Sequence, residues 1–476
     1  MLVEYYFNYV CRIFSSFDGN LNPFRSTVGK LWDGSAPIYY AIQSMAAAYL
    51  ANHFPRMSPV GVQMQRETYR HLYQIQRGGH HSEHLDRKLL TLLLIGQSTA
   101  WHDPKDLGLV HLKTAKQLHN RRIEQQVSQV AGMIDSRSER QNAFFEQCIL
   151  YWDMLAGFVV DDVEEYGLAA FKSTEPIALH DGDLSASNDD KKNIFPHPWT
   201  GVAPKVQRLF AQTGRLIRSY RKSIAEDAIT FGFLSSDLGL DLQNPQDSIV
   251  TIEALSRAQS LEADLLAFEL PLVSSLVDAG DENTPAQHYL DLAEAYRCAG
   301  LLQIYRFFPS ILLKHIPRSN DIFASPSSTN DVTEHIFSFL PLPPPERADE
   351  FLVSLALHTI SLLEKLPSNS GTRCLQSIVI IAAASELRFT SDTAVDLTPI
   401  ITVSSAFNGL TTGEVDIAAA RRFVVTRLQE FQLSLPAKPI VKALQLIQET
   451  WARADLGLNV YWMDVMDEMG LASIFG

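Results

Sequence analysis

The chain has 476 residues, which on length alone is room for about three average domains. Hydrophobic residues make up 46 % and charged residues 20 %, as in ordinary globular proteins, so extended disorder is excluded. Forty Lys and Arg against 54 Asp and Glu give a net charge of −14, which repels the phosphate backbone of nucleic acids. The numbers are typical of an acidic globular protein and disfavour a nucleic-acid-binding one.

Cysteine spacing and the first residues bear on the compartment. Cys11, Cys148, Cys298 and Cys374 are far apart, so we expect reduced, buried thiols and neither a zinc ribbon nor a disulfide framework. The beginning, MLVEYYFNYVCRIF, has an acidic residue where a signal peptide is basic. The longest apolar runs, LLTLLLIG and IVIIAAA, are shorter than the roughly 18 residues of a membrane span. We therefore expect an intracellular protein that is neither secreted nor embedded in a membrane.

Apolar residues recur at helical spacing through the first third of the chain. A helix is predicted to begin after Ser35, because Pro37 suits a first helical turn and no breaker follows before the next proline. Further helices are predicted over residues 85–100, 107–122 and 141–160, and the last is apolar nearly all round, which predicts a helix buried among others. One face of the first helix would hold Ile38, Ala41, Ile42, Met45 and Leu50.

Residues 172–201 differ from their surroundings. They are rich in Asp, Ser, Asn and Pro and lack helical periodicity, so we expect a long exposed connection. It would divide the chain into an amino-terminal helical half, residues 1–171, and a carboxyl-terminal helical half, residues 202–476. Helical segments resume in the second half and are interrupted at 316–332 and 341–346 by stretches with several prolines.

The fold class predicted from these patterns is all-α. Alternating β-branched runs flanked by hairpin dipeptides are few, and no fixed period of 20 to 50 residues repeats. We expect an irregular multi-helix bundle or stacked helical pairs, in two halves joined by the long loop. The helix content should lie well above the roughly one third of average proteins.

Four sequence blocks resemble the fungal-specific transcription factor domain family, in the same order. The first is FNYVCRIFSSFDGNLNPFRSTVGKLW followed by IYYAIQSMAAAYLANHF, where an aromatic-rich helix leads into an Asn-Pro-Phe-Arg turn and an Ala-rich helix. The others are LLTLLLIGQSTAW with LVHLKTAKQL, AEAYRCAGLLQIYRFFP, and YWMDVMDEMG. The resemblance covers residues 7–470, and within the family the chain is most similar to acriflavine sensitivity control proteins.

The resemblance implies an all-helical regulatory region that normally follows a binuclear zinc cluster, in which six cysteines hold two zinc ions and read DNA in the nucleus. This sequence opens directly on the helical region and contains no basic six-cysteine segment. For this chain we therefore expect a nuclear transcription regulator without its own zinc-cluster DNA-binding segment. Its partners would be the transcription machinery or another regulator, with no direct sequence-specific contact to DNA.

Two groups of side chains invite comparison with metal-binding motifs. GGHHSEH places His80, His81, Glu83 and His84 together, a donor set for zinc or nickel, but its glycines and irregular spacing favour a solvated loop. The run DDVEE, residues 161–165, resembles the magnesium-binding motif of class I terpene synthases, so an all-α metal-dependent enzyme of isoprenoid type is the alternative function. The partner motif of that family is not found, because NDVTEH at Asn330 lies in a breaker-rich stretch without the required spacing.

A row of basic residues could contact phosphate groups. Interleaved Leu209, Phe210, Leu216 and Ile217 favour instead an ordinary amphipathic helix whose cations are solvated or paired with acidic residues. The row consists of Lys205, Arg208, Arg215, Arg218, Arg221 and Lys222.

Catalytic fingerprints such as a nucleophile elbow, a P-loop or G-x-G-x-x-G are not found as clean matches. We therefore assign no catalytic, cofactor-binding or metal-binding residue and no cofactor, and we expect a regulator that is not an enzyme. Residues 295–308 and 375–384 are more apolar than one helix face requires, so a pocket for an apolar small-molecule effector between them is one interpretation. Dense packing without a cavity is the favoured one.

Overall fold

A computed structural model of the chain describes residues 1–74, 82–129, 136–161, 178–179, 193–238, 249–315, 348–389 and 412–476. Helices account for most of these residues, which confirms the predicted all-α class. The described strands are β1 (Ala178–Leu179) and β2 (Asn193–Ile194), which pair antiparallel with Ala178 opposite Ile194. Among the described residues no helix is both long and apolar enough to cross a bilayer.

The described helices of the first half begin at the amino terminus. They are α1 (Leu2–Tyr5), a π-helical turn η1 (Tyr6–Val10), α2 (Pro23–Leu31), α3 (Ala36–Leu50), α4 (Met57–Gln74), α5 (Ser82–Gln97), α6 (Thr99–His102), α7 (Leu109–Gln129) and α8 (Ser136–Val159).

The second half begins with the longest helix of the described chain. Its helices are α9 (Pro204–Leu238), α10 (Ile249–Leu266), α11 (Ala286–Phe307), α12 (Pro309–His315), α14 (Ala348–Glu364), α15 (Ser377–Ala384), α16 (Thr412–Ser434), α17 (Ala437–Asp455) and α18 (Trp462–Glu468), with short 3-10 turns η5 (Val273–Ser275) and η8 (Gly371–Leu375).

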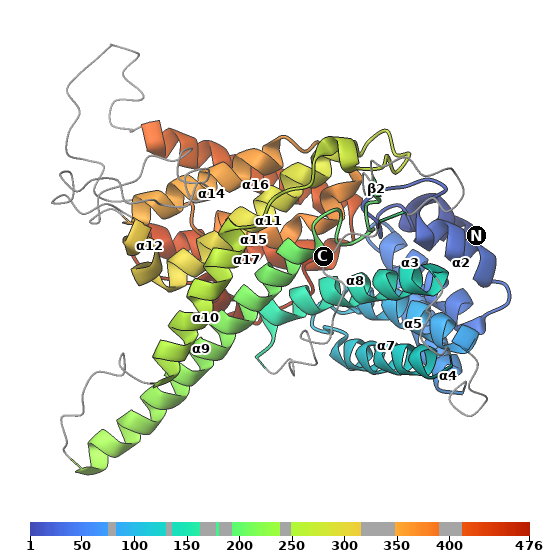
Figure 1. The fold of residues 1–476 in the computed structure, drawn as a ribbon, viewed down its shortest axis with the longest axis horizontal. Helices are drawn as coiled ribbons and strands as arrows, with labels where there is room; N and C mark the ends of the chain where they lie inside the picture. Colours follow the sequence, from blue (N-terminus) through green and yellow to red (C-terminus); the bar gives the residue numbers. More distant parts are fainter. Residues whose placement is uncertain are drawn as a thin grey trace.

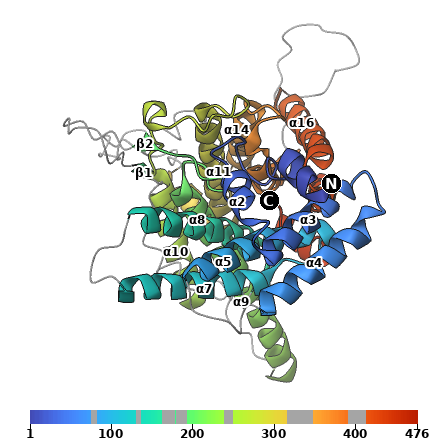
Figure 2. The ribbon, with the colours of Figure 1, turned by 90° about the vertical axis from the view of Figure 1, so that its right-hand side faces the viewer.

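The two sets of helices lie side by side, and α9 runs between them. Figure 1 shows the blue and teal helices of the first half on one side and the yellow to red helices of the second half on the other. Helix α9 packs against α8 from the first half and against α10 and α11 from the second, and its far end extends beyond the other helices in both views (Figures 1 and 2). It therefore links the two halves.

Helices α3 and α8 follow from their sequences. Pro37 lies in the first turn of α3, and Ile38, Ala41, Ile42 and Met45 are fully buried, as predicted, whereas Leu50 is only partly buried. Every residue from 145 to 159 in α8 is buried, because α5, α7 and α9 cover it on different sides. This confirms the central position that its apolar circumference predicts.

One hydrophobic cluster takes residues from both predicted halves, from Tyr6 to Phe475. A second, smaller cluster joins Phe17 to Val202, Ala279, Tyr289 and Leu290. The same core serves both sets of helices, and the division of the chain into halves at 171 and 202 stays a prediction.

The predicted exposed connection over 172–201 is wrong for residues 196–201, which are all buried, whereas Asn193 is exposed. His197 and Trp199 are 2 % and 3 % exposed. The Trp199 ring stacks on Phe24 at 5.2 Å between centroids, and its Nε1 donates to the Phe14 carbonyl at 2.7 Å. Helical periodicity does not detect such a segment, because its aromatic anchors find partners far away in sequence. Apart from Ala178–Leu179 and residues 193–201, the predicted connection lies outside the described residues.

His197 is held as a neutral ring. Its Nδ1 accepts hydrogen bonds from the N–H groups of Trp199 and Thr200, both at 3.1 Å, so the ring proton lies on Nε2 and is donated to the Phe144 carbonyl at 3.2 Å. Burial lowers the pKa of His197 from 6.5 to about 3.

A pH dependence of stability follows. The pKa of His197 is depressed in the folded state, so its contribution to stability is fully present above pH 6.5 and is lost as the pH falls toward 3. We expect chemical unfolding of the wild-type chain to show a free energy that decreases from neutral pH to about pH 4. The His197→Asn variant should take up about one proton fewer than the wild type when it unfolds between pH 6.5 and 4, so its free energy of unfolding should depend less steeply on pH. An unchanged pH slope in the variant would contradict this role.

Candidate functional site

The Asn-Pro-Phe-Arg turn that carries the family resemblance begins helix α2. Asn22 caps the helix, because its Oδ1 accepts from the Phe24 N–H at 2.9 Å and its Nδ2 donates to the Cys11 carbonyl at 3.0 Å. Pro23 occupies the first turn, where its missing N–H costs nothing. The turn therefore ties α2 to the preceding aromatic helix.

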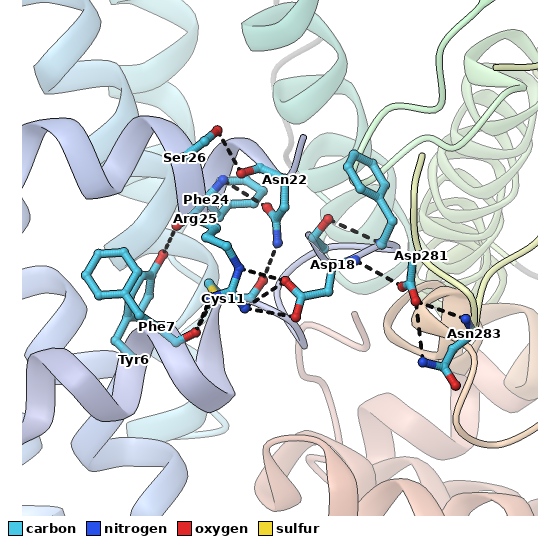
Figure 3. Close-up of polar contacts among 12 residues, drawn as sticks. Tyr6, Phe7, Cys11, Asp18, Asn22, Phe24, Arg25, Ser26, Asp281 and Asn283 are labelled. Carbon is cyan, nitrogen blue, oxygen red and sulfur yellow. Dashed lines mark hydrogen bonds and ion pairs between the residues drawn. The ribbon is translucent and has the colours of Figure 1, made fainter. Parts of the chain in front are cut away.

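Arg25 extends this turn toward a loop. Its guanidinium holds the Asp18 carboxylate with two nitrogens, at 2.8 and 2.9 Å, and donates to the Phe7 carbonyl at 2.7 Å (Figure 3). The bidentate pair fixes the orientation of Asp18. As a result the Asp18 backbone N–H donates to Asp281 Oδ2 at 3.0 Å, across a sequence separation of 263 residues.

The segment 15–18 meets the second half at a junction with the loop around Asp281 and the turn η8. The Ser16 carbonyl accepts from the Tyr289 hydroxyl at 3.1 Å, and Thr284 Oγ1 accepts from the Gly371 N–H at 2.9 Å. A methyl group on Gly371 would overlap the carbonyl group of Ser16. We call these contacts between residues 15–18, 281–289 and 370–373 the junction.

A polar cleft of about 290 Å³ opens at the junction. Arg373 is 6 % exposed, and the described hydrogen bond of its guanidinium is the one that Nη1 donates to the Asn369 carbonyl at 3.1 Å. Burial lowers the pKa of Arg373. The cleft combines charges of both signs, from Arg12, Asp18, Asp281, Glu282 and Arg373, and is completed by Gly19, Gly280, Asn283, Asn369 and Gly371.

An apolar cavity lies behind the same segments. Its volume is about 30 Å³, and the rings of Trp101, Tyr151 and Trp199 form much of its wall. Arg12 and Arg373 line the cleft, whereas the residues that follow them in sequence, 13–14 and 374–375, line the cavity. We call the two segments 12–14 and 373–375 the partition between cleft and cavity. The other lining residues are Ile13, Phe14, Gln97, Cys374, Leu375, Leu435, Pro436, Pro439, Ile440 and Gly476.

This cavity does not lie between residues 295–308 and 375–384, where the sequence offered a place for an effector pocket. The described lining of the cavity includes Leu375 but no residue of 295–308. Helix α11 instead packs directly on η8 and α15, with Tyr296 donating to the Leu375 carbonyl of η8 at 2.7 Å and Gln303 to the Ala382 carbonyl of α15 at 3.0 Å.

The basic row on α9 is largely engaged in ion pairs, as one of the two sequence interpretations predicted. Arg208 pairs with Glu146 at 3.6 Å, and Arg221 pairs with Asp464. Arg215 contacts Asp153, a fully buried carboxylate that also receives Lys116. Lys205 is exposed.

The two candidate metal motifs do not form a site in the described residues. Asp161 pairs with Arg218 at 2.7 Å, and the rest of DDVEE lies outside the described residues. NDVTEH and the side chains of GGHHSEH lie outside them as well.

A different group could hold a metal ion by geometry. Glu294, Cys298 and His358 place one ligand atom each within 4.8 Å of one another. Glu294 is already held by Arg297 at 2.6 Å, and burial raises the pKa of the Cys298 thiol well above its usual value. A protonated thiol is a poor ligand for zinc.

We expect the purified chain to carry well under one zinc ion per molecule. All four cysteines are buried, and burial raises the pKa of Cys11 and Cys374 to about 12. Elemental analysis after removal of loosely bound metal measures this directly. One zinc per chain that disappears in Cys298→Ala would contradict the expectation and identify the Glu294 group as its site.

Cys148 Sγ lies 3.6 Å from His197 Nε2, but Nε2 carries the ring proton, so it cannot take a proton from the thiol. Both are buried, and burial raises the pKa of the thiol and lowers that of the imidazole, so both groups stay neutral. Catalysis requires an accessible thiolate, which this arrangement does not provide. The described residues thus form an all-α domain in which this pair stays neutral.

A model of the fungal specific transcription factor domain matches residues 1–476, so the chain belongs to that family. No curated protein and no solved structure matches the chain. No relative therefore supports the finer likeness to acriflavine sensitivity control proteins. The family match does not support the alternative of an isoprenoid enzyme.

Sequence reasoning missed most of the junction. Asp18, Asp281 and Gly371 belong to no motif, and their partners are remote in sequence. The available signal was the Asn22–Arg25 turn, whose polar ends imply a cap and an anion partner for the arginine. It indicated the family but not what the turn contacts.

Proposed function

We propose that this chain is the regulatory region of a nuclear fungal transcription regulator and that it is not an enzyme. The family match over residues 1–476 is the observation that supports the role in transcription. We propose the transcription machinery or another regulator as its partner. Direct sequence-specific binding to DNA is not expected of these residues, because the net charge is −14 and the described arginines of the α9 row pair with carboxylates.

The test is a reporter assay in yeast. The full chain fused to a heterologous DNA-binding domain should change transcription of the matched reporter several-fold relative to that DNA-binding domain alone. Gly371→Ala, which disturbs the junction, should weaken the effect, whereas Gly413→Ala has open space around the new methyl group and should not. Immunoblots at equal fusion level control for abundance. A wild-type fusion without effect would contradict the proposal.

We further propose that the apolar cavity receives the effector. Aromatic walls favour an apolar ligand, but a volume of about 30 Å³ holds little more than one water-sized group, so binding requires lining side chains to move. The partition formed by residues 12–14 and 373–375 would move with them. Because the other side of the partition is the polar cleft, occupancy would be transmitted to the junction.

Thermal shift against a panel of sterols and lipophilic drugs tests the effector. Ile440 lines the cavity and is 4 % exposed, whereas the next residue of α17, Val441, is 43 % exposed. Ile440→Phe should fill the cavity and abolish the stabilisation by a ligand that raises the melting temperature of the wild type, and Val441→Phe should retain it. No stabilisation at saturating ligand would exclude the compounds tested.

We also propose, from the four sequence blocks, a regulator of the acriflavine sensitivity control type. Deletion of the gene should alter growth on acriflavine, with restoration by the wild-type gene. Unaltered growth of the deletion strain would contradict this refinement and leave the role in transcription unaffected.

A further inference from the structure

A second polar cavity lies in the first half, away from the junction. It measures about 200 Å³ and opens where the beginning of α3 meets the end of α4 and one face of α5. We call it the cationic pocket. Its described lining consists of Gly34, Ser35, Ala36, Pro37, His71, Leu72, Arg87, Lys88 and Thr91.

The charge of this lining is of one sign. Arg87 and Lys88 contribute two cations, and none of the described lining residues is acidic. Of the carboxylates that the structure describes near the pocket, Asp86 is engaged by Arg122 and Glu67 by Arg70, while Asp33 precedes the turn without lining the pocket. Arg87 has an interaction of its own, so the proposal depends on Lys88. The pocket therefore differs from the junction cleft, whose charges are mixed.

Lys88 has no described partner. No described ion pair or hydrogen bond involves its amine, and burial lowers its pKa. The side chain is only partly buried, so water solvates the ammonium group, and an anion that enters the pocket can replace that water. The amine is thus a point charge available to an anion.

The start of α3 adds neutral donors. Ser35 is the N-cap residue and is 8 % exposed, yet its hydroxyl makes no capping hydrogen bond and no other polar contact in the described chain. Ala36 follows with an N–H in the first turn, where helical acceptors are lacking, and the positive end of the helix dipole lies at the same place. The Ser35 hydroxyl and the Lys88 amine come from different helices, have no partner in the described chain and converge on one cavity.

We propose that the cationic pocket binds a small molecule through a phosphate group. Donors from α3 and cations from α5 approach the cavity from different helices, which suits a tetrahedral dianion better than a planar carboxylate. About 200 Å³ leaves room for a small organic group on the phosphate, but is less than drug-sized ligands occupy. The cationic pocket shares no lining residue with the proposed effector cavity, so an experiment can refute one of the two proposals without affecting the other.

Isothermal titration of the full chain at constant ionic strength tests the site. The probes are inorganic phosphate, glycerol 3-phosphate as a phosphomonoester, and acetate. We expect both phosphates to bind, with the monoester tighter if the organic group is accommodated, and acetate to bind at least about tenfold more weakly. Equal affinity for acetate, or no phosphate binding up to about 10 mM, would overturn the proposal.

Matched variants locate the binding. Lys88→Met keeps the aliphatic stem and removes the charge, so phosphate affinity should fall at least about tenfold, and Lys88→Arg should retain most of it. Lys205→Met removes the same charge from an exposed position on α9 and should leave binding unchanged. Ser35→Ala should weaken binding without altering the helical circular dichroism spectrum. Equal losses in Lys88→Met and Lys205→Met would show a non-specific charge effect and refute the site.

Discussion

Replacing Asp153 with alanine is expected to destabilise the fold more than any other single change considered. Asp153 is fully buried in α8, where its carboxylate receives Lys116 from α7 and Arg215 from α9. Removing the carboxylate leaves two cations in a low-dielectric interior without a counterion. The expected loss in the free energy of unfolding is about 3–5 kcal/mol.

The comparison is with a surface ion pair. Asp455 holds Arg421 at 2.7 Å with more than a third of its own side chain exposed, so Asp455→Ala should cost about 1 kcal/mol or less. Urea unfolding followed by circular dichroism measures both variants. Equal losses would mean that the buried pairs contribute no more than the exposed one, and the role assigned to Asp153 would be wrong.

The second large effect is expected at Gly371. An alanine methyl there would overlap the Ser16 carbonyl and crowd the Thr284 hydroxyl, and backbone atoms give way less easily than a flexible side chain. Forcing this contact apart should lower the free energy of unfolding by about 1–3 kcal/mol. It should also loosen the junction between the two halves.

Gly413→Ala serves as the matched control. Gly413 lies near the start of α16, and no atom of the described chain lies within 4 Å of the place that its new methyl group would take, so alanine should be neutral or slightly stabilising. Hydrogen exchange would show the local effect of Gly371→Ala as faster exchange at Gly371 and Asp18, whose N–H groups donate across the junction. If hydrogen exchange at Gly371 and Asp18 and the free energy of unfolding were both unchanged, Gly371 would not be closely packed against Ser16.

The spacing of residues in the sequence was enough to predict the helical framework and to indicate the family. The apolar circumference of α8 predicts its central position, and Pro37 predicts where α3 begins, because both are properties of residues a few positions apart on one helix. The Asn22–Arg25 turn indicated the family for the same reason, since a cap is formed by neighbours in sequence.

Tertiary structure decided which side chains meet. The burial of His197 and Trp199, the position of Lys116 and Arg215 around Asp153, and the contact of Gly371 with Ser16 all join segments far apart in the chain. The cationic pocket likewise requires three helices in one place. Helical periodicity repeats every few residues and fixes which face of a helix is buried. It does not specify which remote segment covers that face, so partners, cavities and buried charges emerge only when the chain is folded.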